Sequence, residues 1–137
     1  MNWFKTTVDR AFEGSVDIEA MVTANELYFA FTSGVTPDLT DTGHEFLDDL
    51  LTAGGTVETE VQLTGASWSA RELDSTASEL TIPDPGGGTT ATYAVLYQKT
   101  GNNTTARVLA SEDISDLTFD GTDDTLGLPT PILEVQA

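Results

Sequence analysis

The chain has 137 residues, a net charge of −18 and no cysteine. This length fits one domain that folds without disulfides or a structural metal, and the missing cysteines exclude thiol catalysis, disulfides and thiolate metal sites. His44 is the only histidine, which excludes multi-histidine metal sites and histidine relays.

The charge is strongly acidic, with 23 Asp and Glu against 5 Lys and Arg. The cations are scattered, so nucleic acids and anionic membranes are disfavoured as partners. The acids are spread out and 39% of residues are hydrophobic, which disfavours a disordered acidic tail. Self-repulsion destabilises such a domain in dilute buffer, and about 1 M salt screens it. The composition therefore predicts a halophilic protein.

Residues 1–14 predict a short amphipathic helix that stops at Gly14. Its apolar side chains fall near one face: Trp3, Phe4, Val8, Ala11 and Phe12. Two interpretations stay open, a helix packed on its own domain or an arm that docks on a neighbouring subunit. The segment lacks a secretory signal pattern, and the chain has no apolar stretch near 18 residues that predicts a membrane span.

A buried strand is predicted over residues 26–32, where Leu27, Phe29 and Phe31 share one face. A turn-rich loop follows it. Residues 43–52 then predict a short helix with one apolar stripe, acids on its outer side and Gly54-Gly55 after it.

In residues 56–65, mostly apolar side chains alternate with Glu58, Glu60 and Gln62, which predicts a strand with an acidic outer face. Residues 66–74 and 79–85 predict shorter strands, and Pro83 and Pro85 close the second. The glycines that follow predict a flexible connector.

Residues 91–100 are apolar on both faces and therefore predict a strand in the centre of the core. A turn at residues 100–103 and a strand over residues 105–113 complete a predicted hairpin. Two strand-like pieces follow, near Thr118–Phe119 and Ile132–Val135.

About seven short strands with frequent turns predict a mainly β fold over residues 1–137. We expect a single β-sandwich domain, of jelly-roll or immunoglobulin-like type, with a short N-terminal helix and one short helix near residues 43–52.

Little in the sequence indicates catalysis. His44-Glu45 is the one adjacent base and acid, and it lies at the start of a predicted helix, where an acid ordinarily compensates the helix dipole. The serines lack a G-x-S-x-G elbow, and residues 86–88 lack the lysine and helix of a phosphate loop. Carboxylate pairs carry no information in so acidic a chain. We therefore predict no catalytic residues and no cofactor.

Two loops carry ambiguous motifs. Residues 120–124 leave open a hard-cation loop or an ordinary turn, but they lack the spacing and the closing glutamate of an EF-hand, so we predict no metal site. Asn102-Asn103-Thr104 and Asn103-Thr104-Thr105 match the glycosylation pattern, although Asn and Thr are also common at hairpin tips.

A longer pattern runs through the chain: Thr32-Ser33 with Pro37-Asp38, then His44, Phe46 and Asp49, and later Tyr93-Ala94-Val95-Leu96-Tyr97. Over residues 24–115 this order resembles a widespread family of small virion structural proteins of tailed phages, regarded as capsid decoration or head proteins with β-sandwich character. The chain departs from the family pattern at Gln98-Lys99, where relatives often carry acids, and in its C-terminal strand. With the halophilic composition, the resemblance implies a virus of haloarchaea.

The resemblance implies a non-enzymatic virion protein, assembled in the host cytoplasm, that decorates or cements the head by binding the major capsid protein or other virion proteins. Such proteins are often symmetric oligomers, with a trimer favoured. The expected docking residues are Trp3, Phe4, Lys5 and Arg10, because aromatic and basic side chains suit interface centres. Two alternatives stay open, a tail, turret or host-contact module and a small hydrolase.

Overall fold

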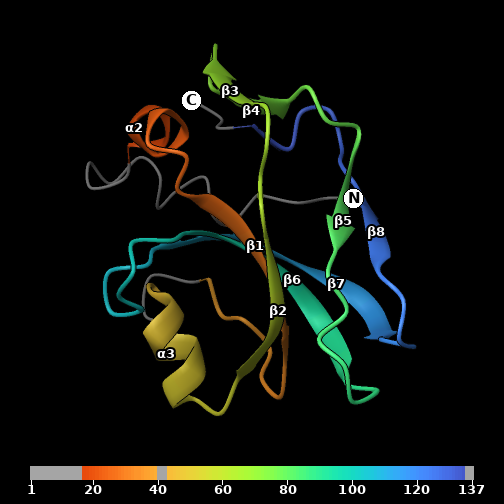
Figure 1. The fold of residues 1–137 in the computed structure, drawn as a ribbon. Helices are drawn as coiled ribbons and strands as arrows, with labels where there is room; N and C mark the ends of the chain where they lie inside the picture. Colours follow the sequence, from red (N-terminus) through yellow and green to blue (C-terminus); the bar gives the residue numbers. More distant parts are fainter. Residues whose placement is uncertain (1–16, 40–42, 135–137) are drawn as a thin grey trace.

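The computed structural model describes residues 17–39 and 43–134. Within these ranges the chain forms two short helices and nine strands (Figure 1). The helices are α2 (Ile18–Thr23) and α3 (Leu47–Thr52), and the strands are β1 (Leu27–Ser33), β2 (Thr56–Gln62), β3 (Ala66–Ser69), β4 (Glu72–Ser75), β5 (Glu79–Ile82), β6 (Thr90–Gln98), β7 (Val108–Thr118), β8 (Asp124–Gly127) and β9 (Leu133–Glu134).

The main sheet has four antiparallel strands in the order β2-β1-β6-β7. The two central strands pair Phe29 with Leu96 and Phe31 with Ala94, and all four side chains are fully buried. Full burial of a side chain such as Phe or Leu stabilises a fold by about 1.5–3 kcal/mol. The predicted central position of the strand over residues 91–100 is therefore confirmed.

Both faces of this sheet are covered. One face packs against the smaller sheets β3-β4-β9 and β5-β8, which contribute Leu73, Leu80, Leu126 and Leu133 to a shared apolar cluster. A second cluster on the opposite face joins α3 to the main sheet. Figure 1 shows α3 lying apart from β5 and β8, with the main sheet between them. The prediction of a mainly β, sandwich-like fold is confirmed.

Strand β7 is interrupted by a wide bulge. The register against β6 jumps between the pairs Ala91–Leu117 and Tyr93–Asp113, so the three residues 114–116 lie opposite the single residue Thr92. Ser115 and Asp116 both have a φ of 56°, in the left-handed region. The Asp113 carboxylate accepts a hydrogen bond from the Ser115 N–H at 2.7 Å, which helps to hold this conformation.

Strand β2, at the other edge of the sheet, also contains an extra residue. Phe31 pairs with Thr59 and Thr32 with Val57, which leaves Glu58 bulged. The Ser33 hydroxyl donates to the Glu58 carboxylate at 2.6 Å. Both edge strands of the main sheet are therefore kinked within the described part of the chain.

The helix predicted over residues 43–52 is shorter than expected, because it begins at Leu47. Phe46 forms a bridge with Arg107, and its φ of −119° and ψ of 159° are extended rather than helical. Pairing with the β6–β7 hairpin therefore keeps residues 43–46 out of the helix.

Residues 66–74 were expected to form one strand, and this expectation is wrong. They form the hairpin β3–β4, whose turn residues Ala70 and Arg71 have φ values of 50° and 67°. Such a turn normally uses Asn or Gly, so the sequence carries no turn signal here.

Two further elements were not expected, and one predicted element is not tested. Helix α2 was not expected, although the Asp17 carboxylate accepts from the Ala20 N–H at 3.0 Å as an N-cap does. Strand β8 was not expected either, and the strand-like piece near Thr118–Phe119 is the end of β7. The helix predicted over residues 1–14 lies outside the described residues.

Candidate functional site

The β6–β7 hairpin is fixed to the start of α3 by backbone hydrogen bonds. The Leu47 N–H donates to the Ala106 carbonyl at 2.8 Å, and the Asp48 N–H donates to the Asn103 carbonyl at 3.0 Å. The first N–H groups of a helix have no partner within the helix, so the hairpin satisfies two of them. Helix and hairpin therefore form one rigid unit.

The side chain of Asp49, in the first turn of α3, stabilises the residues just before the helix. Its carboxylate accepts from the backbone N–H of Glu45 at 3.1 Å and of Phe46 at 2.9 Å. The same segment is tied to the β6–β7 hairpin, because Arg107 donates to the Glu45 carboxylate at 2.7 Å and lies over the Phe46 ring at 4.8 Å. The residues of the pattern His44-Glu45-Phe46 with Asp49 thus hold the start of α3 in place.

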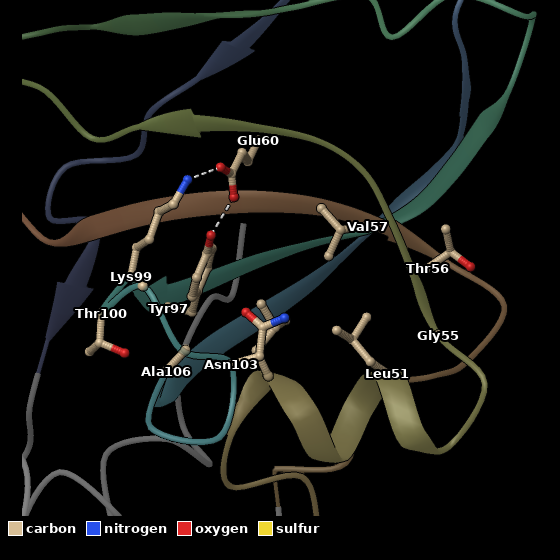
Figure 2. A pocket seen from close by; sticks show the side chains of 12 residues that line it. Leu51, Gly55, Thr56, Val57, Glu60, Tyr97, Lys99, Thr100, Asn103 and Ala106 are labelled. Carbon is tan, nitrogen blue, oxygen red and sulfur yellow. Dashed lines mark hydrogen bonds and ion pairs between the residues drawn. The ribbon is translucent and has the colours of Figure 1, made fainter.

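Beside this unit lies a hollow of about 440 Å³, the candidate functional site (Figure 2). Four elements line it: α3, the start of β2, the end of β6 and the β6–β7 hairpin. The lining residues are Leu47, Leu51, Gly55, Thr56, Val57, Glu60, Tyr97, Lys99, Thr100, Gly101, Asn103 and Ala106. Its volume falls in the range of about 300–1,000 Å³ typical of pockets that hold a drug-sized group.

One end of the hollow is polar. Glu60 and Tyr97 both face it, because Glu60 pairs with Ala30 and Tyr97 with Tyr28 on the same face of β1. The Glu60 carboxylate accepts hydrogen bonds from the Tyr97 hydroxyl and the Lys99 ammonium (Figure 2). The ammonium also lies 4.8 Å from the centre of the Tyr28 ring.

These contacts set the charge states of the cluster. Burial by itself raises the pKa of Glu60, but the bonds from Lys99 and Tyr97 outweigh it and lower the pKa below the ordinary 4.5. Burial, and next the bond to Glu60, raise the pKa of Tyr97 well above its ordinary 10. At neutral pH Glu60 is therefore a carboxylate and Tyr97 a neutral phenol.

The opposite walls of the hollow are apolar. Figure 2 shows Leu51 on α3 and Val57 on β2 on either side, with Ala106 of the hairpin nearby. Leu51 and Val57 are half-buried, while Leu47 is almost completely buried behind them. This arrangement suits a ligand group with an apolar body, held against a polar end.

His44 has a local structural role. Its ring Nδ1 accepts a hydrogen bond from the backbone N–H of Asp38 at 2.9 Å. The backbone N–H of His44 donates to the Asp38 carbonyl at 2.6 Å. These bonds connect the two loop motifs Pro37-Asp38 and His44, which explains their spacing.

Residues 120–124 form a turn that is joined to the β5–β6 loop. The Asp120 carboxylate accepts from the N–H and hydroxyl of Thr122 at 3.1 and 2.7 Å, and these bonds lower its pKa. The Asp84 carboxylate accepts from Gly121 N–H at 2.7 Å. Across residues 17–39 and 43–134, no group of three or more His, Asp or Glu side chains is arranged to hold a metal ion.

The predicted docking residues Trp3, Phe4, Lys5 and Arg10 lie outside the described residues, so their placement stays a prediction. The residues around the hollow were missed by sequence reasoning. One signal was present, because Tyr97 and Lys99 are two apart in a strand and therefore share a face.

Among the described residues, no helix is long and apolar enough to cross a membrane. Comparison of the chain with protein-family models, with curated proteins and with solved structures finds no match.

Proposed function

We propose that this chain is a non-enzymatic structural protein of a virion, a decoration or cement protein on the head of a tailed virus that infects a halophilic host. It binds to the major capsid protein or to other virion proteins and adds contact area across the lattice. Each contact can be weak, because many copies act together.

One observation carries this proposal. The motifs that resemble the virion family are far apart in the sequence, yet they meet in one structural unit. Thr32 pairs directly with Tyr93 across β1 and β6, and Val95 packs with Leu47 and Leu50 of α3 in the second apolar cluster. The residues that carry the resemblance therefore lie in one part of the fold, as the proposed relationship requires.

The charge distribution supports a salt-rich setting. Many acids of the described residues are exposed, among them Glu19, Glu79 and Glu134. Two of the cations are held by acids, since Lys99 is paired with Glu60 and Arg107 with Glu45. The surface is therefore left with a large excess of negative charge, which molar salt screens.

The test is the copy number in purified particles. We expect quantitative mass spectrometry of virions to find this chain in hundreds of copies, in a fixed ratio to the major capsid protein. A handful of copies would place it in the tail or at a vertex instead, and absence from the particles would end the proposal.

A further inference from the structure

Among the described residues, the hollow beside α3 leaves apolar side chains partly exposed. Leu51 and Val57 remain half-buried there, whereas Leu47 and Leu50 of the same apolar cluster are buried. Apolar surface with a polar rim is typical of an interaction site. The occupant must therefore bring an apolar group of side-chain size.

The charge around the hollow limits the occupant further. The Glu60 carboxylate already accepts two hydrogen bonds, and a carboxylate offers about four acceptor positions, so it can accept from another donor. Lys99 also lines the hollow and balances the charge of Glu60, but it leaves these acceptor positions open. A hydrogen-bond donor next to the apolar group is thus favoured, and a cationic donor is favoured over an acid because the chain as a whole carries a charge of −18.

One stretch of this chain has that chemistry. Residues 1–12 contain the adjacent pair Trp3-Phe4, followed by Lys5 and Arg10. They carry two cations and one acid, a net charge of +1, which leaves −19 on the rest of the chain. Aromatic and basic side chains are also the commonest anchors at the centres of interfaces.

The length of this stretch allows it to reach another molecule. Sixteen residues precede Asp17, the N-cap of α2, and a fully extended chain of that length spans about 50 Å. The radius of gyration expected for a domain of this size is about 14 Å. Even as the predicted helix over residues 1–14, which would be about 21 Å long, the stretch is longer than this radius and can therefore reach a neighbouring copy.

We propose that the hollow is the docking site for residues 1–12 of a second copy of this chain, with Trp3 and Phe4 between Leu51 and Val57 and a cation beside Glu60. The choice of a second copy rests on the proposed function, in which many copies lie side by side. Such an exchange brings the positive stretch of one strongly acidic molecule into contact with the negative body of the next, and partly buried contacts of this kind are screened by salt much less than charges further apart.

The test uses the full chain and the quenching of a bimane label by tryptophan, which requires near contact. The chain has no cysteine, so Thr56→Cys gives a single label on the exposed rim of the hollow. The labelled copy also carries Trp3→Phe. Unlabelled copies with or without Trp3 are then added in molar salt.

We expect the unlabelled chain to quench the label, and its Trp3→Phe form to leave it bright. Leu51→Asp in the labelled copy weakens the binding by about tenfold or more, as expected for a central interface position. Thr52→Asp is the matched control, because it adds the same charge to an exposed residue of α3 that does not line the hollow. Circular dichroism verifies that both variants fold.

Two results overturn the proposal. One is equal brightness with and without Trp3 in the added chain, and the other is equal quenching of a label on Glu79→Cys, which is exposed on β5 away from the hollow. Neither of these results alters the copy number in particles, so the proposed function is tested separately.

Discussion

Glu60 and Glu112 lie on opposite faces of the main sheet, and their surroundings shift their pKa values in opposite directions. Glu60 pairs with Ala30 on the face that packs against α3, and there two donors hold it. Glu112 pairs with Ala94 on the inner face of the sandwich, and its Oε2 is buried with no hydrogen-bond partner in the described part of the chain. The same residue type is therefore stabilising in one place and destabilising in the other.

Replacement of Glu60 by Gln is expected to lower the free energy of unfolding at pH 7 by about 1 kcal/mol, less than for a fully buried charged bond because the pair is partly exposed. Since the pKa of Glu60 is lowered in the fold, its contribution is present above the ordinary 4.5 and is lost as the pH falls through the lowered value. Urea unfolding at pH 7 and pH 3 measures this difference.

The control for Glu60→Gln is a double-mutant cycle with Lys99→Met. The two single changes should each cost stability, and the double variant should cost less than their sum. Strict additivity at pH 7 would mean that the ion pair contributes nothing.

Replacement of Glu112 by Gln is expected to raise the melting temperature at pH 7. Burial, together with the nearby Asp113 carboxylate, raises the pKa of Glu112. The fold therefore favours the protonated side chain, and the stability that this state contributes is lost as the pH rises through the raised pKa. The gain should shrink below pH 4, where Glu112 is protonated in both states. Glu79→Gln, an exposed site, controls for the change in net charge, and an equal gain from it would contradict this explanation.

Helix α3 is a short element whose position depends on hydrogen bonds at its start. A helix of six residues is not stable by itself, so its position depends on the hairpin carbonyls and on the Asp49 carboxylate. The geometry of the hollow follows from this, because Leu47 and Leu51 belong to that helix.

Asp49→Ala is expected to cost about 1 kcal/mol, the usual value for loss of a helix cap, and to loosen the wall of the hollow. Asp48→Ala is the matched control, since no side-chain bond of Asp48 stabilises the start of the helix in the described structure and only a few tenths of a kcal/mol of dipole interaction is lost. Thermal unfolding, with hydrogen exchange at Leu50 as a local measure, compares the two. Equal losses would show that the capping bonds are unimportant.

The sequence predicted the elements whose evidence is local. Strands β1 and β6 were found because both carry apolar residues on both faces, and β2 because its residues alternate. The β3–β4 hairpin was missed because its turn uses Ala70 and Arg71. The cluster of Glu60, Tyr97 and Lys99 was missed because residues 37 and 39 positions apart meet only through the register with β1, which no local pattern specifies.

For the whole molecule, the dominant quantity is the net charge of −18. Repulsion between exposed acids acts over about 10 Å at 0.1 M salt but over only about 3 Å at 1 M. Stability should therefore depend on salt more strongly than for a balanced protein.

We expect the melting temperature to rise steadily from dilute buffer to multi-molar KCl. A variant with Glu19, Glu79 and Glu134 changed to Gln should melt higher than the parent in dilute buffer, and this advantage should disappear in molar salt. These acids are exposed, and no side-chain bond of theirs stabilises the described fold, so packing is unaffected. A salt-independent melting point would contradict the halophilic interpretation.

The bulges in β2 and β7 acquire a particular importance under these conditions. In concentrated brine, electrostatic repulsion no longer keeps identical molecules apart, so solubility must come from shape. A straight strand at the border of a sheet is a template onto which another chain can add its own strand, and a kink removes the straight row of donors and acceptors that such growth needs. With Glu58 displaced on one border and residues 114–116 on the other, neither border of the main sheet offers a neighbouring molecule a straight strand on which to add its own.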